Sequence, residues 1–579
     1  MTDDLILDIR GLRTSFFTDA GEIRAVDGVD LALRRGRTTC VVGESGSGKS
    51  ALARSILQVV DQPGRIVDGA IDYRPTDGSE PIGLATFDPR GRAIRRIRGK
   101  EIAMIFQEPM AALSPVHTIG RQIADLLEEH EGIRRRDRRC RERVVAALEE
   151  VGIPRPQERI DAYTFQLSGG MRQRAMIAMA MITRPRLLIA DEPTTALDVT
   201  TQAQVLDLIR QEKSASGMSV MFITHDLGVV AEIADDVVVM RHGKVQESGP
   251  VEQIFNDPQH SYTRELLATL PQRAAVRAES VSSAPAQLTT PPIMEVADLR
   301  MEFRAPSRRL FRRGSGEAVK AVDGVSFALP QGSTLGIVGE SGCGKTTLGR
   351  TILRAYQPSD GNIWYHGPDG RVDLATLDER ELAPYRQQIR MIFQDPYGSL
   401  NPRMTVQDVI TEPLRAAGMR DRTEIEDRAA EAIRWVGLDP VVLQRYPHAF
   451  SGGQRQRIGI ARALITEPSV VVADEAVSAL DVSIRAQVLE LLAKLQDDLG
   501  LTYLFISHDL SVVERICDEV AVMSFGKIVE HRPTAELFAD PQHGYTRALL
   551  SAVPIADPAE RGSRKRATYR PATEAITSA

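Results

Sequence analysis

Short uncharged runs alternate with longer amphipathic stretches along the chain. Residues 38–42, 187–190 and 220–223 carry no charge and are mostly apolar, a pattern typical of strands buried on both faces of a parallel sheet. Residues 134–150 and 422–436 are rich in charge but keep apolar residues at helical spacing, which predicts amphipathic helices. Buried strands that alternate with helices indicate an α/β fold.

A glycine-rich loop follows the first of these strands. Residues 43–50 match the pattern G-x-x-x-x-G-K-[ST] in full, and apolar residues at helical spacing follow it. Because glycine has no Cβ, backbone N–H groups of such a loop approach phosphate oxygens closely, and the next helix directs its positive end at them. We expect Lys49 to reach the β- and γ-phosphates and Ser50 to bind Mg²⁺.

The same pattern recurs in full at residues 339–346, so a chance match no longer explains it. The chain is therefore predicted to contain two nucleotide sites. The residues predicted to contact the nucleotides in the two loops are Gly43, Ser45, Gly46, Gly48, Lys49 and Ser50, and Gly339, Ser341, Gly342, Gly344, Lys345, Thr346 and Thr347.

Most of the chain is an internal repeat. Residues 25–29, Ala-Val-Asp-Gly-Val, recur at 321–325, and from the Ser-Gly-Gly runs at 168 and 451 onward the two halves stay in register. The segment between the halves is rich in Ala, Ser, Thr and Pro, which predicts an extended linker. The expected organisation is a first domain at 1–271, a flexible linker at 272–293, a second domain at 294–555 and a disordered tail at 556–579.

Two carboxylates end one apolar strand in each half. Asp191 and Glu192 follow residues 187–190, and Asp474 and Glu475 follow the copy. Acids at the carboxyl ends of parallel strands lie at the edge of the sheet where ligands bind. We expect Asp191 and Asp474 to bind Mg²⁺ directly or through water, and Glu192 and Glu475 to polarise the attacking water.

A histidine and a glutamine also follow apolar strands in each half. A lone histidine at a strand end is more often structural than catalytic. The repeat and the neighbouring carboxylates favour the other interpretation, that His225 and His508 contact the γ-phosphate. Gln107 and Gln394 occupy matching positions, and alone each would be an ordinary surface residue.

A Ser-Gly-Gly run opens a predicted helix in each half. Serine is a common N-cap, and glycines beside it leave N–H groups accessible to an anion. A plain helix cap is the simpler explanation, but a cap needs no second glycine and both copies keep it. The predicted second anion contacts are Ser168, Gly169 and Gly170, and Ser451, Gly452 and Gly453.

Composition limits the function classes. Hydrophobic residues make up 42% of the chain, charged residues 26%, and the net charge is −6, which disfavours nonspecific nucleic-acid binding. No run of about 18 apolar residues is present, and the N-terminus lacks the basic start of a secretion signal, so we expect a cytoplasmic location. The four cysteines have no zinc or iron–sulfur spacing.

Taken together, the motifs resemble those of the ATP-binding cassette ATPases of membrane transporters, over nearly the whole chain. Residues 167–171 and 450–454 look like the family's signature motif, and 195–198 and 478–481 like its D-loops. Gln107 and Gln394 match its Q-loops, with a share in Mg²⁺ binding. The resemblance implies two tandem P-loop NTPase domains, each a RecA-like core with a helical insert and a small antiparallel β subdomain. Phe16 and Phe303 are placed to stack on adenine.

The resemblance also implies a mechanism. The halves face head to tail, so that one ATP lies between Lys49 and Ser451 and the other between Lys345 and Ser168. Binding of two ATP molecules closes the pair and hydrolysis reopens it. Both halves keep the lysine, glutamate, serine and histidine, so two competent sites with ATP and Mg²⁺ are expected. Met171 in the first signature and Ala476 after Glu475 depart from the family pattern.

A narrower resemblance concerns residues 255–267, which recur at 538–550 with the shared run Asp-Pro-Gln-His-x-Tyr-Thr-Arg. This looks like the C-terminal mark of the oligopeptide/dipeptide importer subfamily. It implies a peripheral ATPase at the cytoplasmic face of the membrane, two permease partners and an extracytoplasmic solute-binding protein. Many relatives follow the mark with cysteines that bind an iron–sulfur cluster. This chain has none there, so no cluster is predicted.

Alternatives remain open at this point. Relatives of the subfamily carry glutathione, nickel or opines, and the ATPase does not contact the cargo. A soluble twin-cassette ATPase acting on ribosomes or DNA is a second class, although such proteins usually have a charged helical linker or zinc-binding cysteines. An export ATPase fits the cassettes but not the repeated Tyr-Thr-Arg mark.

Overall fold

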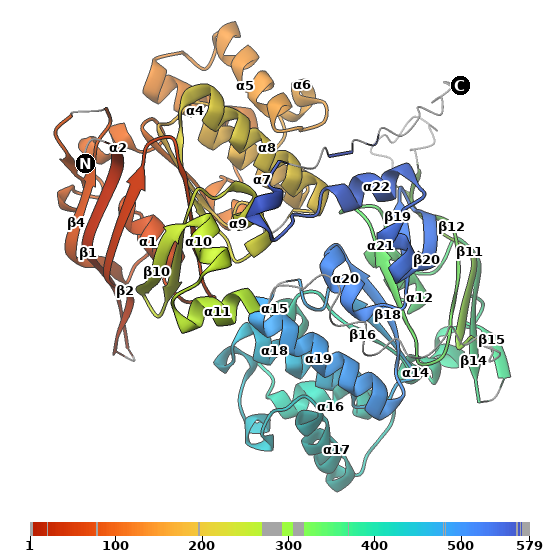
Figure 1. Ribbon diagram of the computed structural model, residues 1–579. Coiled ribbons are helices and arrows are strands. Elements are labelled where there is room, and N and C mark those ends of the chain that lie inside the picture. The colour runs from red at the N-terminus through yellow and green to blue at the C-terminus, as the bar shows by residue number, and fades with distance from the viewer. Residues whose placement is uncertain are drawn as a thin grey trace, which may run out of the picture. The chain divides into compact units, whose positions relative to one another are not determined.

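The structure is a computed structural model (Figure 1) and describes residues 4–19, 21–76, 79–194, 197–268, 292–304, 318–368, 370–478, 480, 482–562, 566–567 and 569. The chain forms two compact units. The first contains the described residues up to 268 together with 553–562, and the second contains those from 292 to 552 with 566, 567 and 569. The described residues after 552 are thus divided between the two units.

The first unit is built on a six-stranded sheet with the order β10-β9-β3-β8-β7-β6. All neighbouring pairs are parallel except β9 and β10. The strands are β3 (Thr38–Val42), β6 (Ile102–Ile105), β7 (Leu187–Asp191), β8 (Ser219–Ile223), β9 (Asp236–Arg241) and β10 (Lys244–Pro250).

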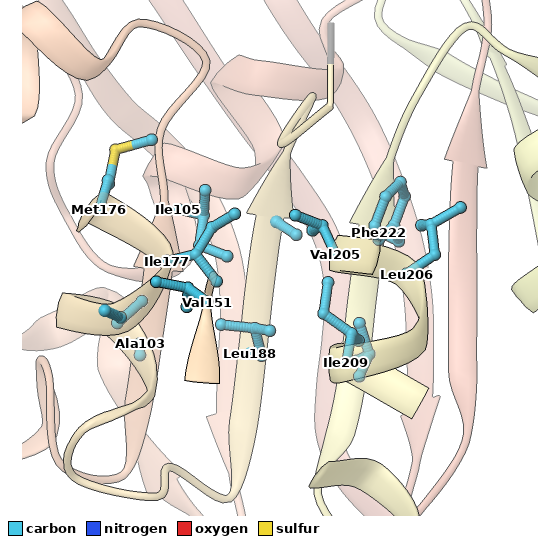
Figure 2. Packing of buried hydrophobic residues seen from close by; sticks show 14 of the residues in the cluster. Ala103, Ile105, Val151, Met176, Ile177, Leu188, Val205, Leu206, Ile209 and Phe222 are labelled. Carbon is cyan, nitrogen blue, oxygen red and sulfur yellow. The ribbon is translucent and has the colours of Figure 1, made fainter. Parts of the chain in front are cut away.

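Both faces of this sheet are covered, which explains the uncharged strands predicted from the sequence. Leu188 and Phe222 belong to one buried cluster together with residues of the helices, as Figure 2 shows. Ile189 and Met221, the neighbours of those residues along the strands, belong to a second cluster. Successive side chains of a strand point to opposite faces, so a strand buried on both faces must be apolar at every position.

The second cluster fills the space between the six-stranded sheet, helix α1 (Lys49–Ile56) and a four-stranded antiparallel sheet. The order of the smaller sheet is β2-β1-β4-β5, with β1 (Leu5–Thr18), β2 (Gly21–Arg34), β4 (Gly64–Tyr73) and β5 (Ile82–Gly83). This sheet is the small β subdomain predicted by the family resemblance.

The helices of the first unit include the predicted amphipathic insert, and α4, α5 and α6 gather at the top of this unit in Figure 1. They are α1 (Lys49–Ile56), α2 (Arg92–Ile97), α3 (Pro109–Ala112), α4 (Ile119–Glu131), α5 (Arg138–Glu150), α6 (Pro156–Arg159), α7 (Gly169–Met181), α8 (Val199–Ser216), α9 (Leu227–Ile233), α10 (Val251–Asn256) and α11 (Ser261–Ala268), with 3-10 turns at Leu84–Thr86 and Thr164–Gln166.

The second unit repeats this architecture. Its six-stranded sheet has the order β16-β17-β18-β13-β19-β20, with only β20 antiparallel, and its four-stranded sheet has the order β12-β11-β14-β15. The strands are β11 (Met294–Arg304), β12 (Ala318–Leu329), β13 (Thr334–Val338), β14 (Asp360–Gly367), β15 (Gly370–Asp373), β16 (Ile389–Ile392), β17 (Val470–Asp474), β18 (Thr502–Ser507), β19 (Glu519–Ser524) and β20 (Lys527–Pro533).

The helices of the second unit follow a similar order along the chain. They are α12 (Lys345–Ile352), α13 (Glu379–Leu382), α14 (Tyr385–Gln388), α15 (Pro396–Ser399), α16 (Val406–Ala416), α17 (Arg422–Trp435), α18 (Gly452–Leu464), α19 (Val482–Leu499), α20 (Leu510–Ile516), α21 (Thr534–Ala539) and α22 (Gly544–Ser551), with 3-10 turns at Pro440–Gln444 and Pro447–Ala449. Within the described ranges of both units, no helix combines the length and the apolar character needed to cross a membrane.

The predicted linker, apart from Pro292 and Ile293, lies outside the described residues, as do Thr195, Ala196, Ala479 and Asp481 of the predicted D-loops. The predicted disordered tail differs from the structure at its beginning. Pro558–Glu560 form a 3-10 turn, and Arg561 donates hydrogen bonds to the carbonyls of Ile233 and Ala234, both at 2.9 Å. These contacts hold the segment against the C-terminal end of α9.

Candidate functional site

The predicted site residues of the first unit follow four strands of one sheet. The phosphate loop follows β3, Gln107 follows β6, Asp191 and Glu192 end β7, and His225 follows β8. These strands are parallel and adjacent in the order β3-β8-β7-β6, so their carboxyl ends meet at one edge of the sheet. The second unit places Gln394, Asp474, Glu475 and His508 in the same way.

The lysine of each phosphate loop is buried and bonded to the loop itself. Lys49 Nζ donates to the carbonyl oxygens of Gly43 and Glu44, both at 2.8 Å. Lys345 Nζ donates to Gly339 and Glu340 at 2.7 and 2.9 Å. Each ammonium group is therefore held by backbone carbonyls at the start of its own loop.

Glycine is required at the last turn of both loops. Gly48 has φ +99°, and a Cβ there would lie 2.1 Å from the carbonyl oxygen of Ala25. Gly344 has φ +109°, and its Cβ would lie 2.0 Å from Ala321 O. The repeated Ala-Val-Asp-Gly-Val run therefore packs its first carbonyl against the loop. Ser45, Gly46, Ser341 and Gly342 are exposed at the loop tips, and Thr347 is half-buried beside Thr346.

A hydroxyl and a carboxylate meet beside each loop. Ser50 Oγ donates to Asp191 Oδ1 at 2.9 Å, and Thr346 Oγ1 donates to Asp474 Oδ1 at 3.0 Å. Burial raises the pKa of Asp191 to about 6, against the hydrogen bond from Ser50, and burial likewise raises the pKa of Asp474. The Oδ2 atom of Asp191 is buried and has no hydrogen-bond partner in the described part of the chain.

The glutamates are held by a glutamine and a histidine. Glu192 accepts from Gln107 Nε2 at 2.9 Å, and its other oxygen lies 3.3 Å from His225 Nδ1. The corresponding distances at Glu475 are 2.6 Å to Gln394 Nε2 and 3.1 Å to His508 Nδ1.

The pKa of Glu475 and the backbone of both glutamates are also unusual. Although burial alone would raise the pKa of Glu475, the hydrogen bond and the charge of His508 hold it below the ordinary value. Glu192 and Glu475 also have φ +46° and +48°, a left-handed conformation that is costly for a residue with a side chain and is often found at functional sites.

The signature serines cap helices. Ser168 Oγ accepts from the N–H of Met171 at 3.3 Å. Ser451 Oγ accepts from Gln454 N–H at 3.4 Å, and Gln454 Oε1 accepts from Ser451 N–H at 3.2 Å. The second signature thus has a reciprocal capping box, while Met171 cannot return the bond. Ser168, Gly169 and Ser451 are exposed, whereas Gly452 is half-buried and Gly453 is buried, where a Cβ would lie 2.5 Å from Ile484.

The two aromatic residues predicted to stack on adenine lie on matching strands. Phe16 is half-buried on β1, close to Gly64, and Phe303 is exposed on β11 with an edge-to-face contact to Tyr356 at 5.5 Å. Their positions correspond despite the nine additional residues between Phe303 and its phosphate loop. Adenine stacking stays a prediction.

Two residues near the phosphate loops were not predicted to contact them. The hydroxyl of Tyr262, on α11, accepts from Glu44 N–H at 3.2 Å, and that of Tyr545, on α22, accepts from Glu340 N–H at 2.9 Å. The repeated His-x-Tyr-Thr-Arg run was the only signal in the sequence, and it gave no indication of this contact.

Comparisons with known proteins agree with these features. The ABC transporter family matches residues 26–195 and 322–478. The family described as oligopeptide/dipeptide transporter, C-terminal region, matches residues 246–293 and 529–578. The second pair of matches includes both copies of the Asp-Pro-Gln-His-x-Tyr-Thr-Arg run.

Similar proteins include the glutathione import ATP-binding protein GsiA of Salmonella typhimurium (strain LT2), which is 47% identical over 578 residues, covering 97% of this chain and 91% of the relative. GsiA of Escherichia coli (strain K12) is 47% identical over 574 residues, covering 96% and 90%. Among solved structures, the dimeric post-hydrolysis structure of the ATP-binding cassette MJ0796 with ADP and Pi covers 42% of this chain and 98% of that chain, at 25% identity and a TM-score of 0.37.

The sequence-based predictions of family and fold class are thereby confirmed. Two cassette matches cover more than half of the chain, and the similarity to the import ATP-binding proteins extends over nearly all of it. The chain belongs to the ABC transporter family, as an ATP-binding ATPase with two fused cassettes that carries the oligopeptide/dipeptide transporter C-terminal region twice.

Proposed function

We propose that this chain hydrolyses ATP to power the import of a short peptide through membrane permeases, with glutathione, itself a tripeptide, as the first candidate. One observation carries the ATPase part. A carboxylate held by a glutamine and a histidine lies at the phosphate edge of the sheet in both units. The names of the similar import proteins support the solute class.

In the proposed reaction Glu192 and Glu475 polarise the attacking water, a role worth about 10²–10⁴-fold in rate. His225 Nδ1 lies 3.3 Å from a carboxylate oxygen of Glu192, and we propose that the imidazole also contacts the γ-phosphate. Lys49 and Lys345 exchange the loop carbonyls for the β- and γ-phosphates. The water-polarising group and the phosphate-binding group thus come from different strands of one sheet.

The oxygens beside each loop fit a magnesium ion. Mg²⁺ prefers oxygen ligands and is commonly held by one or two protein oxygens and the phosphates. Ser50 Oγ, Thr346 Oγ1 and the carboxylates of Asp191 and Asp474 supply such oxygens. Asp191 Oδ2 accepts no hydrogen bond from the described residues, which suits a metal ligand. Gln107 and Gln394 are the further proposed ligands. Bound Mg²⁺ would neutralise charge on the β- and γ-phosphates.

Each ATP is proposed to complete its site with the signature serine of the other half. Lys49 would act with Ser451, and Lys345 with Ser168. The helix caps formed by both serines support this role, because a capped helix start with adjacent glycines directs N–H groups at an anion.

The proposed partners are two permeases and an extracytoplasmic solute-binding protein, with the ATPase peripheral at the cytoplasmic face. Support comes from the segment after Gln107. Met110 and Val116 are 51% and 72% exposed there, and exposed apolar side chains are suited to contact another protein.

The test is uptake of labelled glutathione and of labelled di-, tri- and longer peptides. Cells with the intact chain are compared with cells carrying Glu192→Gln and Glu475→Gln together. The matched control carries Glu150→Gln and Glu431→Gln, at two exposed helix positions. Loss of glutathione uptake only in the first variant supports the proposal. Unchanged uptake of every peptide in that variant would exclude this solute class.

A further inference from the structure

The two copies of the subfamily mark contact the phosphate loops, and this contact has no role in the function proposed above. Tyr262 and Tyr545 are buried, with 2% and 4% of their surface exposed. Their hydroxyls accept from the N–H groups of Glu44 and Glu340, the second residue of each loop. Because both units have this contact, chance does not explain it.

The N–H group held by each tyrosine belongs to the peptide bond whose carbonyl holds the lysine. In the first unit, Gly43 O accepts from Lys49 Nζ at 2.8 Å, and the N–H of the same peptide donates to Tyr262. In the second unit, Gly339 O accepts from Lys345 Nζ at 2.7 Å, and the N–H donates to Tyr545. A peptide group is planar, so fixing its N–H also fixes the direction of its carbonyl.

Each tyrosine is held in place by the rest of the mark. Tyr262 N–H donates to His260 Nδ1 at 3.2 Å, and the N–H groups of Gln259 and His260 donate to the Glu247 carboxylate at 2.7 and 3.0 Å. The Arg241 guanidinium lies 4.4 Å from the centroid of the Tyr262 ring.

The second unit repeats this support with a different partner on the ring. Tyr545 N–H donates to His543 Nδ1 at 3.2 Å, and the N–H groups of Gln542 and His543 donate to Glu530 at 2.8 and 3.0 Å. Tyr569 packs edge-to-face on the Tyr545 ring at 5.7 Å. The backbone of each tyrosine is therefore linked to β10 or β20 through its histidine and the glutamate of that strand.

We propose that Tyr262 and Tyr545 are positioning residues for nucleotide binding. Each hydroxyl fixes the first peptide of the phosphate loop, so that its carbonyl holds the lysine at the phosphate position before ATP arrives. The inference rests on ATP binding alone and not on the identity of the imported solute.

The test measures the affinity of the purified full chain for ATP after Tyr262→Phe and Tyr545→Phe are introduced together. Phenylalanine keeps the buried ring and removes one hydrogen bond per loop. The expected loss of affinity is about three- to tenfold, the usual net value of one such bond. The matched control is Tyr73→Phe with Tyr503→Phe, because these hydroxyls donate to Glu101 and to Leu492 O and do not contact the loops. The control pair is expected to bind ATP like the intact chain.

A second comparison separates positioning through the lysine from a merely structural effect. In a Lys49→Ala, Lys345→Ala background the carbonyl has no amine to hold, so removing the hydroxyls should change ATP affinity by less than about twofold. An equal loss in both backgrounds would overturn the proposal, as would a Tyr→Phe pair that binds ATP like the control pair.

Backbone hydrogen exchange gives a readout that does not depend on nucleotide. Peptides covering residues 43–48 and 339–344 should exchange faster in the Tyr→Phe pair than in the control pair, with peptides of β7 and β17 unchanged. If the Tyr→Phe pair lowers the unfolding temperature, exchange in the folded fraction still decides the matter. Unchanged exchange in the two loop peptides would overturn the proposal.

Discussion

Gln107 donates its side-chain amide to the carboxylate of Glu192 at 2.9 Å, and Gln394 makes the same bond to Glu475 at 2.6 Å. The other oxygen of each glutamate faces a histidine. Both carboxylates are therefore oriented before nucleotide is present. A carboxylate oriented in this way beside a phosphate loop is suited to polarise water, and this relationship leads to the first two predictions.

Replacing Glu192 and Glu475 together by Gln should reduce phosphate release by about 10²–10⁴-fold, the usual contribution of a general base. Gln has the same shape and does not contact the loops' lysines, so equilibrium ATP binding should stay within about twofold. Phosphate release and ATP binding are measured on the same preparations, with Glu150→Gln, Glu431→Gln as the control. A rate above a tenth of the intact chain's would contradict the assigned role.

The single variants Glu192→Gln and Glu475→Gln should both lower the rate. The two sites have the same glutamine, histidine and hydroxyl–carboxylate contacts, so neither is expected to be inactive. Steady-state phosphate release from each single variant checks this. If one of them hydrolyses ATP as fast as the intact chain, the corresponding site is not competent.

The left-handed backbone at Glu192 predicts a difference between Ala and Gly at this position. At φ +46° Ala retains the steric cost of its Cβ and Gly does not, so Glu192→Gly should be more stable than Glu192→Ala by about 1 kcal/mol. The comparison removes the carboxylate in both variants and isolates the backbone. Urea unfolding measures the difference.

Glu142, exposed within α5, is the control for this comparison. In a helix the order reverses, and Ala should be more stable than Gly by about 1 kcal/mol. If the Ala variant is the more stable one at position 192 as well, the backbone at Glu192 is not strained.

Arg561 should stabilise the first unit. It donates to the last carbonyls of α9 and lies 3.5 Å from Asp235, and a cation at a helix C-terminus is favourable. Arg561→Ala should lower the free energy of unfolding by about 1.5–3 kcal/mol, the range for hydrogen bonds to charged groups. Arg547→Ala, an exposed arginine on α22, is the control. Equal unfolding curves for both variants would contradict the contact.

Asp235 should make the free energy of unfolding of the first unit depend on pH. Burial alone would raise the pKa of Asp235, but Lys213, the Thr38 N–H and Arg561 together hold it below the ordinary value. The folded protein therefore binds the proton of the Asp235 carboxyl less tightly than the unfolded chain does. The stabilisation is present above the ordinary pKa of about 3.9, and it is lost as the pH falls through the lower pKa of the folded state.

Asp235→Asn should accordingly be less stable than the intact chain at pH 7. The gap should narrow as the pH falls below about 4, because the intact chain then loses the same charge. Urea unfolding of Asp235→Asn and the intact chain, at pH 7 and at a pH below about 4, checks this. A gap of constant size would show that the ionised form of Asp235 is not the stabilising species.

Much of the fold was predictable because the patterns that indicate it involve residues close together in the sequence. The two phosphate loops, the uncharged strands and the Asp-Glu pairs each occupy a few consecutive residues, and the repeat indicated two similar domains. Glycine loops and strand periodicity are local properties of the chain. The D-loops and the linker remain predictions, because several of their residues lie outside the part that the structure describes.

The sequence by itself determined which chemical groups each unit has and at which strand ends they occur. Only the tertiary structure decided which of them meet. Strand order brings Gln107 to Glu192 across 85 positions, and packing of α11 brings Tyr262 to Glu44 across 218. Residues 553–562 belong with the first unit although they follow the second. Such contacts depend on the packing of distant elements, and no pattern among neighbouring residues encodes them.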